Sequence, residues 1–194
     1  MNENQKLIVI TAPSGAGKTS ITHFLVNQFA QLIFSVSATT RLPRADEKNG
    51  VDYYFISTGE FLQKIHDDAF VEWEMVYKGK YYGTLKTELE KIWNENKTPI
   101  LDIDVKGAIH VQEQYRENSL SIFIEPPSIE ALKKRLESRG TETQKGLQTR
   151  LSKATYEISF KHYFDIIIIN DDFDKACAET EAAVKKFLEV KVGN

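Results

Sequence analysis

The residues from Ala12 to Thr19 have the types and order of a phosphate-binding loop. An apolar, β-branched run from Leu7 to Thr11 precedes them, and apolar residues at helical spacing follow. The two glycines of this loop let successive backbone N–H groups point into one concavity, which can hold phosphate oxygens. Lys18 can reach β- and γ-phosphates, and the hydroxyl of the next residue can ligate Mg²⁺. The residues expected to contact ATP here are Ala12, Pro13, Ser14, Gly15, Ala16, Gly17, Lys18, Thr19 and Ser20.

This loop departs from the usual pattern at its first position, where Ala12 stands in place of a glycine. A strand-to-helix turn that merely uses glycines is the alternative interpretation, and it does not explain Lys18 and Thr19 at the start of the helix. The helix start adds unpaired N–H groups and a positive dipole end, both of which favour an anion. We therefore predict that the chain binds a nucleoside triphosphate.

Two further cations lie three residues apart on the loop after the second predicted strand, at Arg41 and Arg44. Joining two phosphate groups brings two polyanions together, so cations beyond Lys18 are needed. These arginines can hold an acceptor phosphate in bidentate fashion, and Tyr53 and Tyr82 offer hydroxyl donors. The alternatives are a solvated surface loop for the arginines and ordinary strand packing for the tyrosines.

Carboxylates occur where strands are predicted. Asp102 and Asp104 end a buried strand over 99–104, and on a regular strand residues two apart point to the same face. P-loop enzymes place the carboxylate that holds Mg²⁺, often through water, at the end of such a strand. Glu72 lies in the run Val71–Tyr77, whose alternating apolar and acidic residues predict a half-buried strand. Taken alone, that pattern places Glu72 on the exposed face.

Strands alternate with helices along the chain, which predicts an α/β fold with a parallel sheet wrapped on both sides. Residues from about 37 to 84 are predicted to form a small β-rich insertion. Ser57 and Ser128 are predicted to cap helices. The run Ile166–Ile169 is uniformly apolar and predicts a last strand covered on both faces. A helix from about Asp174 to Leu188 is expected to follow.

Composition places the 194-residue chain among ordinary globular proteins, with 41% hydrophobic and 27% charged residues. A net charge of −3 gives no support for binding nucleic acid through bulk charge. The single Cys177, in a helical stretch, excludes an internal disulfide and is expected to be passive. No apolar run approaches the ~20 residues that span a membrane, and the first residues lack a signal-peptide pattern. These features predict a cytoplasmic protein with no membrane partner.

Several motifs together resemble the guanylate kinase family. They occur in the family's order and at similar spacings, from about Lys6 to Phe187: APSGAGKT, SATTRLPR, YYF, FVEW, YYGT, LDIDVKGA, LESRGTET and IINDD. Lys106 stands where the family more often has glutamine, and Lys145-Gly146 where acidic residues are common. Neither departure falls on a residue to which we assign chemistry.

The resemblance implies a P-loop enzyme that transfers the γ-phosphoryl group of ATP to GMP, and also to dGMP, with Mg²⁺. Family roles map onto positions of this sequence as follows. The phosphate of GMP is bound by Arg41, Arg44, Tyr53 and Tyr82. The guanine base is read by Glu72 and Ser37, with Asp104 and Thr84 as further contacts. Mg²⁺ is held by Thr19 and Asp102. Charge for catalysis comes from Lys18, Arg41, Arg139 and Arg150, with Arg135 near ATP and Asn170 at adenine.

Three of these assignments keep alternatives. The division of metal and base between Asp102 and Asp104 rests on the resemblance, and a plain strand-end cap is the alternative for Asn170. A basic helix face is the alternative for the arginines after Ser128.

We expect a single guanylate kinase-like domain, with a core over 1–36, 89–127 and 159–194. The GMP-binding region covers about 37–88 and a helical lid about 128–158, and both are expected to close over the bound nucleotides. A guanylate kinase-like scaffold domain without catalysis is one rival, disfavoured because Lys18 and Thr19 are intact. A P-loop kinase for another small phosphate acceptor is the second. The sequence does not distinguish a monomer from a homo-oligomer.

Overall fold

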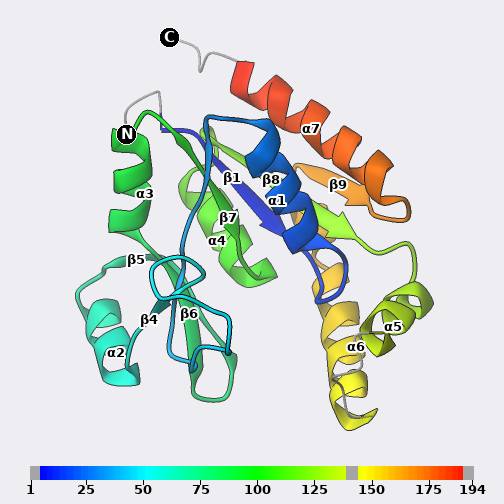
Figure 1. The fold of residues 1–194 in the computed structure, drawn as a ribbon, viewed down its shortest axis with the longest axis horizontal. Coiled ribbons are helices and arrows are strands. Elements are labelled where there is room, and N and C mark those ends of the chain that lie inside the picture. The colour runs from blue at the N-terminus through cyan, green and yellow to red at the C-terminus, as the bar shows by residue number, and fades with distance from the viewer. Residues whose placement is uncertain (1–4, 139–143, 190–194) are drawn as a thin grey trace.

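The structure is a computed structural model that describes residues 5–138 and 144–189. Its centre is a sheet with strand order β2-β7-β1-β8-β9, in which all neighbouring strands are parallel (Figure 1). Parallel strands need crossover connections, and the helices that supply them cover the sheet. This confirms the predicted α/β fold. The strands are β1 (Leu7–Thr11), β2 (Leu32–Phe34), β7 (Thr98–Asp102), β8 (Ser119–Glu125) and β9 (Ile166–Ile169).

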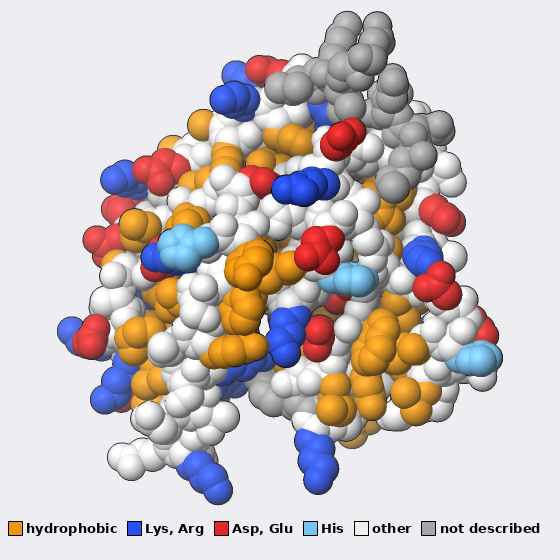
Figure 2. Space-filling view, turned by 180° about the vertical axis from the view of Figure 1, so that it is seen from behind, with side chains coloured by type: hydrophobic (Ala, Val, Ile, Leu, Met, Phe, Trp, Pro, Cys, Tyr) orange, Lys and Arg blue, Asp and Glu red, His pale blue; other side chains and the backbone are white. Residues whose placement is uncertain are grey.

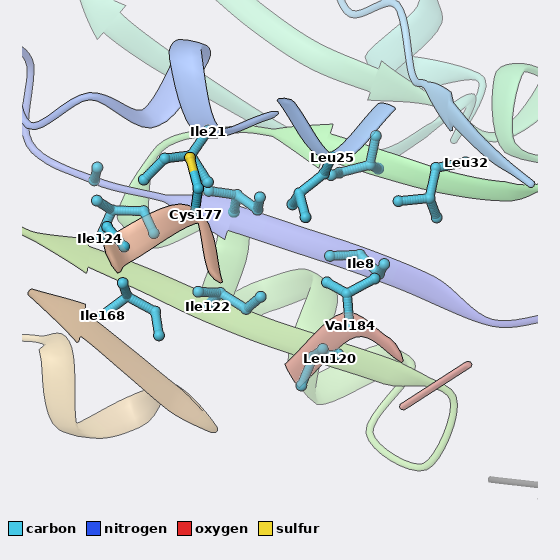
Figure 3. Packing of buried hydrophobic residues seen from close by; sticks show 14 of the residues in the cluster. Ile8, Ile21, Leu25, Leu32, Leu120, Ile122, Ile124, Ile168, Cys177 and Val184 are labelled. Atoms are coloured by element: carbon cyan, nitrogen blue, oxygen red, sulfur yellow. The ribbon is translucent and has the colours of Figure 1, made fainter. Parts of the chain in front are cut away.

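Alternate residues of β1 enter two separate cores. Ile8 and Ile10 pack with residues of α1 and α7, whereas Leu7 and Val9 pack with residues of α3 and α4. Figure 3 shows the first of these cores, with Cys177 of α7 among the isoleucines, so the cysteine is a buried packing residue. Burial on both faces explains why β1 is apolar from Leu7 to Ile10. The helices are α1 (Lys18–Gln28), α3 (Lys86–Asn94), α4 (Val105–Gln114) and α7 (Phe173–Glu189).

A second sheet is inserted between β2 and β7, with strand order β4-β3-β6-β5. It has its own small core, in which Ala38, Phe61 and Phe70 are buried, and this confirms the predicted β-rich insertion. The Tyr54 hydroxyl donates to buried Glu88 at 2.8 Å and so ties this sheet to α3. Its elements are β3 (Ala38–Thr39), β4 (Tyr54–Phe55), α2 (Thr58–His66), β5 (Phe70–Tyr77) and β6 (Lys80–Leu85).

Two helices, α5 (Ile129–Glu137) and α6 (Gln144–Ile158), form a pair beside the core. Leu132 and Leu136 of α5 and Ala154 of α6 are buried against each other. In Figure 1 this pair and the second sheet extend from the same end of the core sheet. A short 3₁₀ helix, η1 (Lys161–Tyr163), leads to β9.

The predicted helix caps are confirmed. Ser57 accepts a hydrogen bond from the Glu60 N–H at 3.1 Å, and Ser128 accepts one from the Ala131 N–H at 3.0 Å. Each bond satisfies one of the N–H groups that a helix start leaves unpaired.

Two expectations were wrong. Strand β9 is not covered on both faces, because Ile167 is 36% exposed and Ile169 55% exposed. The strand lies at the edge of the sheet beside β8, and a uniformly apolar run does not distinguish an edge strand from a central one. Strand β7 ends at Asp102, so the alternation argument does not extend to Asp104. That residue is instead the N-cap of α4, where it accepts from the Gly107 N–H at 2.9 Å.

Among the residues that the structure describes, no helix is both long and apolar enough to cross a membrane. On the face shown in Figure 2, basic and acidic side chains are interspersed rather than segregated by sign. That distribution agrees with the small net charge of −3.

Candidate active site

The phosphate loop connects β1 to α1 with the backbone that its glycines predict. Gly15 and Gly17 have φ of 94° and 99°, in the left-handed region that favours glycine. The Asn170 side chain occupies the space that a Cβ at position 17 would need. Its amide nitrogen donates to the Ala16 carbonyl at 2.7 Å, so the end of β9 holds the loop in place.

Lys18 is the first residue of α1, and its ammonium nitrogen lies 2.5 Å from an oxygen of Asp102. It also donates to the Ile103 carbonyl at 3.1 Å. Burial alone lowers the pKa of Lys18, but the Asp102 carboxylate outweighs that effect and the net pKa is raised. The loop therefore carries a fixed positive charge at neutral pH.

Thr19 and Asp102 offer a hydroxyl and a carboxylate side by side, with Thr19 Oγ1 3.4 Å from Asp102 Oδ2. These are the hard oxygen ligands that Mg²⁺ prefers. Within 5–138 and 144–189, no group of three or more His, Cys, Asp or Glu side chains could hold a metal. The pair therefore fits an ion that takes its remaining ligands from nucleotide phosphates and water, as Mg²⁺ commonly does.

One cavity of about 360 Å³ joins the phosphate loop to the second sheet and to α6. Because the core strands are parallel, their carboxyl ends open on the same edge, and the cavity lies there. The predicted residues that line it are Ala12, Pro13, Ser14, Gly15, Gly17, Lys18, Thr19, Ser20, Ser37, Arg44, Tyr53, Glu72, Tyr82, Asp102, Asp104 and Arg150. Side chains from three separate parts of the sequence thus meet around one space.

Glu72 lines this cavity yet is only 5% exposed, so it is not on a solvated strand face. The Thr84 hydroxyl donates to its Oε1 at 2.7 Å. Burial raises the pKa of Glu72 to about 7, and the nearby Asp104 and Glu74 carboxylates add to the rise. A Cβ at Gly107 would lie 2.5 Å from Glu72 Oε2, so the absence of a side chain there leaves room for the carboxylate.

The two arginines of the second loop differ in placement. Arg44 lines the cavity, whereas the Arg41 guanidinium forms a two-pronged ion pair with Glu47, with both N···O distances 2.6 Å. Arg41 also lies over the Tyr53 ring, 4.9 Å from its centroid. The rings of Tyr53 and Tyr82 are 6.0 Å apart in an edge-on contact, and both line the cavity. Glu47 was not predicted as a site residue, because its spacing from Arg41 gave no signal by itself.

The helical pair is hydrogen-bonded both to the phosphate loop and to the residue that follows β9. Arg150 of α6 donates to the Ser14 hydroxyl at 2.8 Å, and Arg135 of α5 donates to the Asn170 carbonyl at 2.8 Å. Arg139, predicted to be catalytic, lies outside the described residues. The predicted residues that do not line the cavity are Ala16, Arg41, Thr84, Arg135 and Asn170.

Three charged side chains that were not predicted as site residues also line the cavity: Glu74, Lys153 and Glu157. Glu74 follows Glu72 by two positions on a strand, and the other two follow Arg150 on one helix face, so strand and helix periodicity could have found them. Glu157 is only 7% exposed, and burial raises the pKa of its carboxyl. Lys153 Nζ lies 3.5 Å from it.

Comparison with known proteins decides the family. A family profile described as "Guanylate kinase" matches residues 4–187. The chain belongs to the guanylate kinase family. A guanylate kinase of Bacteroides thetaiotaomicron is 46% identical over 183 residues, covering 94% of this chain and 90% of that protein. One of Porphyromonas gingivalis is also 46% identical, covering 94% of this chain and 98% of its own.

A solved structure agrees with this assignment. A crystal structure of guanylate kinase from Anaplasma phagocytophilum matches with a TM-score of 0.77 and 30% identity. It covers 96% of this chain and 88% of that one. The chain is therefore an enzyme of the nucleoside monophosphate kinase class, and the family expected from the motifs is confirmed.

Proposed function

We propose how the residues of this cavity carry out the guanylate kinase reaction, in which the γ-phosphoryl group of ATP passes to GMP to give ADP and GDP. The observation that carries the proposal is that one cavity is lined by Lys18 of the phosphate loop and by Arg44 and Glu72 of the second sheet. A donor triphosphate and an acceptor nucleotide can thus meet in a single space. We extend the acceptor to dGMP, which carries the same base and phosphate.

ATP binds with its phosphates on the loop from Ala12 to Ser20. The backbone N–H groups of the loop and the start of α1 hold the phosphate oxygens, and Lys18 contacts the β- and γ-phosphates. Arg135 and Asn170 support the adenine end, where their mutual hydrogen bond and the bond from Asn170 to Ala16 fix the loop.

GMP binds between the two sheets. Arg41, Arg44, Tyr53 and Tyr82 hold its phosphate. Glu72 accepts hydrogen bonds from the guanine N1–H and N2–H₂ groups, while Ser37, Thr84 and Asp104 complete the base contacts. Adenine lacks that pair of donors, so it would leave a buried carboxylate unpaired, which supports selection for guanine by roughly 10⁴-fold.

Thr19 and Asp102 would hold Mg²⁺, since they offer a hydroxyl oxygen and a carboxylate oxygen 3.4 Å apart. The ion would neutralise phosphate charge and orient the β- and γ-phosphates of ATP.

Transfer needs no general base, because the GMP phosphate is largely a dianion at pH 7, with a second pKa of about 6. Lys18, Arg41 and Arg150 hold positive charge around the transferring group, and we assign the same role to Arg139. Catalysis is then positioning together with electrostatic stabilisation of a loose, in-line transition state.

Exclusion of water by the second sheet (about 37–88) and the helical lid (about 128–158) protects ATP from hydrolysis. Both regions belong, in this proposal, to one domain of a cytoplasmic enzyme of purine nucleotide metabolism.

The test is release of ADP from Mg-ATP with GMP, dGMP, AMP, UMP and CMP offered separately. We expect turnover with GMP and dGMP alone. Turnover with another acceptor would keep the donor site and refute the assignment of base recognition to Glu72. Binding of GMP without ADP release would indicate a non-catalytic domain.

A further inference from the structure

We propose that Glu47 is a positioning residue for the acceptor phosphate: it occupies one edge of the Arg41 guanidinium and thereby presents the other edge to the phosphate of GMP. This inference rests on the proposed function, in which Arg41 and Arg44 bind that phosphate. It adds a residue that contacts no substrate atom and acts through the two arginines.

Glu47 closes the loop that carries both arginines. Its Oε1 and Oε2 accept from Nη2 and Nη1 of Arg41, each at 2.6 Å, and Oε2 also accepts from the Arg44 backbone N–H at 2.7 Å. Charge-assisted, two-pronged bonds of this kind fix orientation as well as adding energy. The Arg41 and Glu47 side chains are only 10% and 16% exposed, so solvent competes weakly with them. The Glu47 carboxylate thus positions both the Arg41 side chain and the Arg44 backbone.

Counting donors identifies which edge of Arg41 remains for a phosphate. A guanidinium has five N–H groups in a planar fork. Glu47 takes one from each Nη, and the Leu42 carbonyl accepts a third, from Nη1, at 3.0 Å. The two that remain are Nε–H and the second Nη2–H, which point in the same direction along the far edge. No hydrogen-bond acceptor for these two is found in the described ranges 5–138 and 144–189. That edge is a complete two-donor fork, the shape that matches phosphate oxygens.

Aromatic rings fix the plane of this fork. The Arg41 Cζ lies 4.9 Å from the centroid of the Tyr53 ring and 5.5 Å from that of Phe55. Tyr53 lines the cavity, and its hydroxyl lies within electrostatic range of Lys18 as well as of Arg41. The guanidinium is therefore packed against Tyr53, a residue of the cavity wall, and its in-plane rotation is set by Glu47 together with the Leu42 carbonyl.

Two opposite roles are open to Glu47, and the effect of its removal on GMP affinity distinguishes them. A carboxylate that took the place of the phosphate would compete with GMP, and removing it would tighten binding. Removing a positioning carboxylate would instead weaken GMP binding. The guanidinium would then be free to rotate and the loop to relax, and GMP would have to order both on binding. The unused two-donor edge of Arg41 favours the second role. The Arg41 guanidinium holds the pKa of Glu47 down to about 2, so the pair stays ionised throughout the neutral range.

The experiment compares binding of GMP, guanosine and ATP to the wild-type chain, to Glu47→Gln and to Glu47→Asp by isothermal titration calorimetry. Guanosine has the base but not the phosphate, so it reports general damage to the acceptor site. We expect Glu47→Gln to weaken GMP binding by roughly 10- to 100-fold, the loss of one charge-assisted hydrogen bond. Guanosine and ATP should change by less than about twofold. Glu47→Asp keeps the charge but shortens the side chain, so its affinity for GMP should lie between those of the wild-type chain and Glu47→Gln.

Asp46→Asn is the matched control, because Asp46 is an exposed neighbour on the same loop and its change removes the same unit of charge. It should leave GMP affinity within about twofold. Tighter GMP binding by Glu47→Gln would make Glu47 a competitor, and equal losses for GMP and guanosine would make it merely structural. Either result overturns the proposal. If the wild-type chain itself fails to bind GMP, the proposed function fails instead, so the two failures are distinguishable.

Discussion

Replacing Glu72 with Gln should weaken binding of guanine nucleosides while making the free protein more stable above pH 7. The reason lies in its burial, which raises the pKa of the carboxyl from 4.5 to about 7. Between those two values the folded chain holds a proton that the unfolded chain has released, so the contribution of Glu72 to stability falls as pH rises and is least favourable above pH 7. Two and a half pH units correspond to about 3 kcal/mol of unfolding free energy. Gln is the neutral isostere, and its Oε1 can still accept from the Thr84 hydroxyl.

Binding should show the complementary pH dependence. Only the ionised carboxylate accepts from both guanine donors, and with a pKa of about 7 roughly nine tenths of Glu72 is ionised at pH 8 and about one tenth at pH 6. The dissociation constant of guanosine should therefore rise about tenfold from pH 8 to pH 6. Guanosine is the appropriate ligand because the phosphate of GMP titrates near pH 6 itself. The Asp104 and Glu74 carboxylates lie near Glu72 and are retained in the variant. A pH dependence that arises from them would therefore persist in Glu72→Gln.

Calorimetry with guanosine and thermal unfolding, each at pH 6 and pH 8, would measure both effects. Glu72→Gln should bind guanosine weakly at both pH values and should unfold several degrees higher than wild type at pH 8, since about 1 kcal/mol shifts Tm by 2–4 °C at this size. A variant that is less stable than wild type at pH 8, with a pH-independent wild-type affinity, would refute the reasoning. Glu72 would then be an ionised structural residue.

Two other substitutions test the two ends of the cavity by steady-state kinetics. Lys18→Ala removes the cation that lies against Asp102 and should lower kcat on the order of 10³-fold, and near-normal turnover would contradict its role. Gly107→Ala places a methyl group 2.5 Å from Glu72 Oε2 and should raise KM for GMP about tenfold with little change for ATP. Gly59→Ala is its control, since nothing lies within 4 Å of the added methyl group, and it should leave both KM values unchanged. An equal rise in both KM values for Gly107→Ala would mean general damage.

The sequence predicted best where a local rule fixes both backbone and chemistry. The phosphate loop, the serine caps and the β-rich insertion were all found in this way, because glycines, capping residues and alternation each act over a few positions. Ile169 shows where such rules end. Its apolar neighbours gave no sign that β9 lies at the sheet edge, since edge position is decided by the order of the strands in space.

Site residues were missed for a related reason. Glu47 is held by an arginine six positions earlier, a distance at which no regular element brings side chains together. Glu157 lies on a helix whose apolar pattern indicates only packing, and its place on the cavity depends on how α6 meets the core. Glu72 was predicted as a site residue from the family resemblance, whereas its strand pattern alone favoured exposure. The structure buries it. Long-range packing thus decided the environments of Glu72 and Glu157, whereas an irregular loop decided that of Glu47.

The strand order of the core has a consequence for biosynthesis. Within the described part of the chain, strand β1 pairs with β7 and β8 and strand β2 pairs with β7, so neither has one of these partners while the ribosome is still making the second sheet. The second sheet has all its strands within one stretch of chain and can form as soon as β6 has emerged. At about 5–20 residues per second, the apolar β1 waits several seconds without a neighbour. A nascent chain should therefore form its second sheet before its central sheet, with β1 unpaired until β7 has been translated.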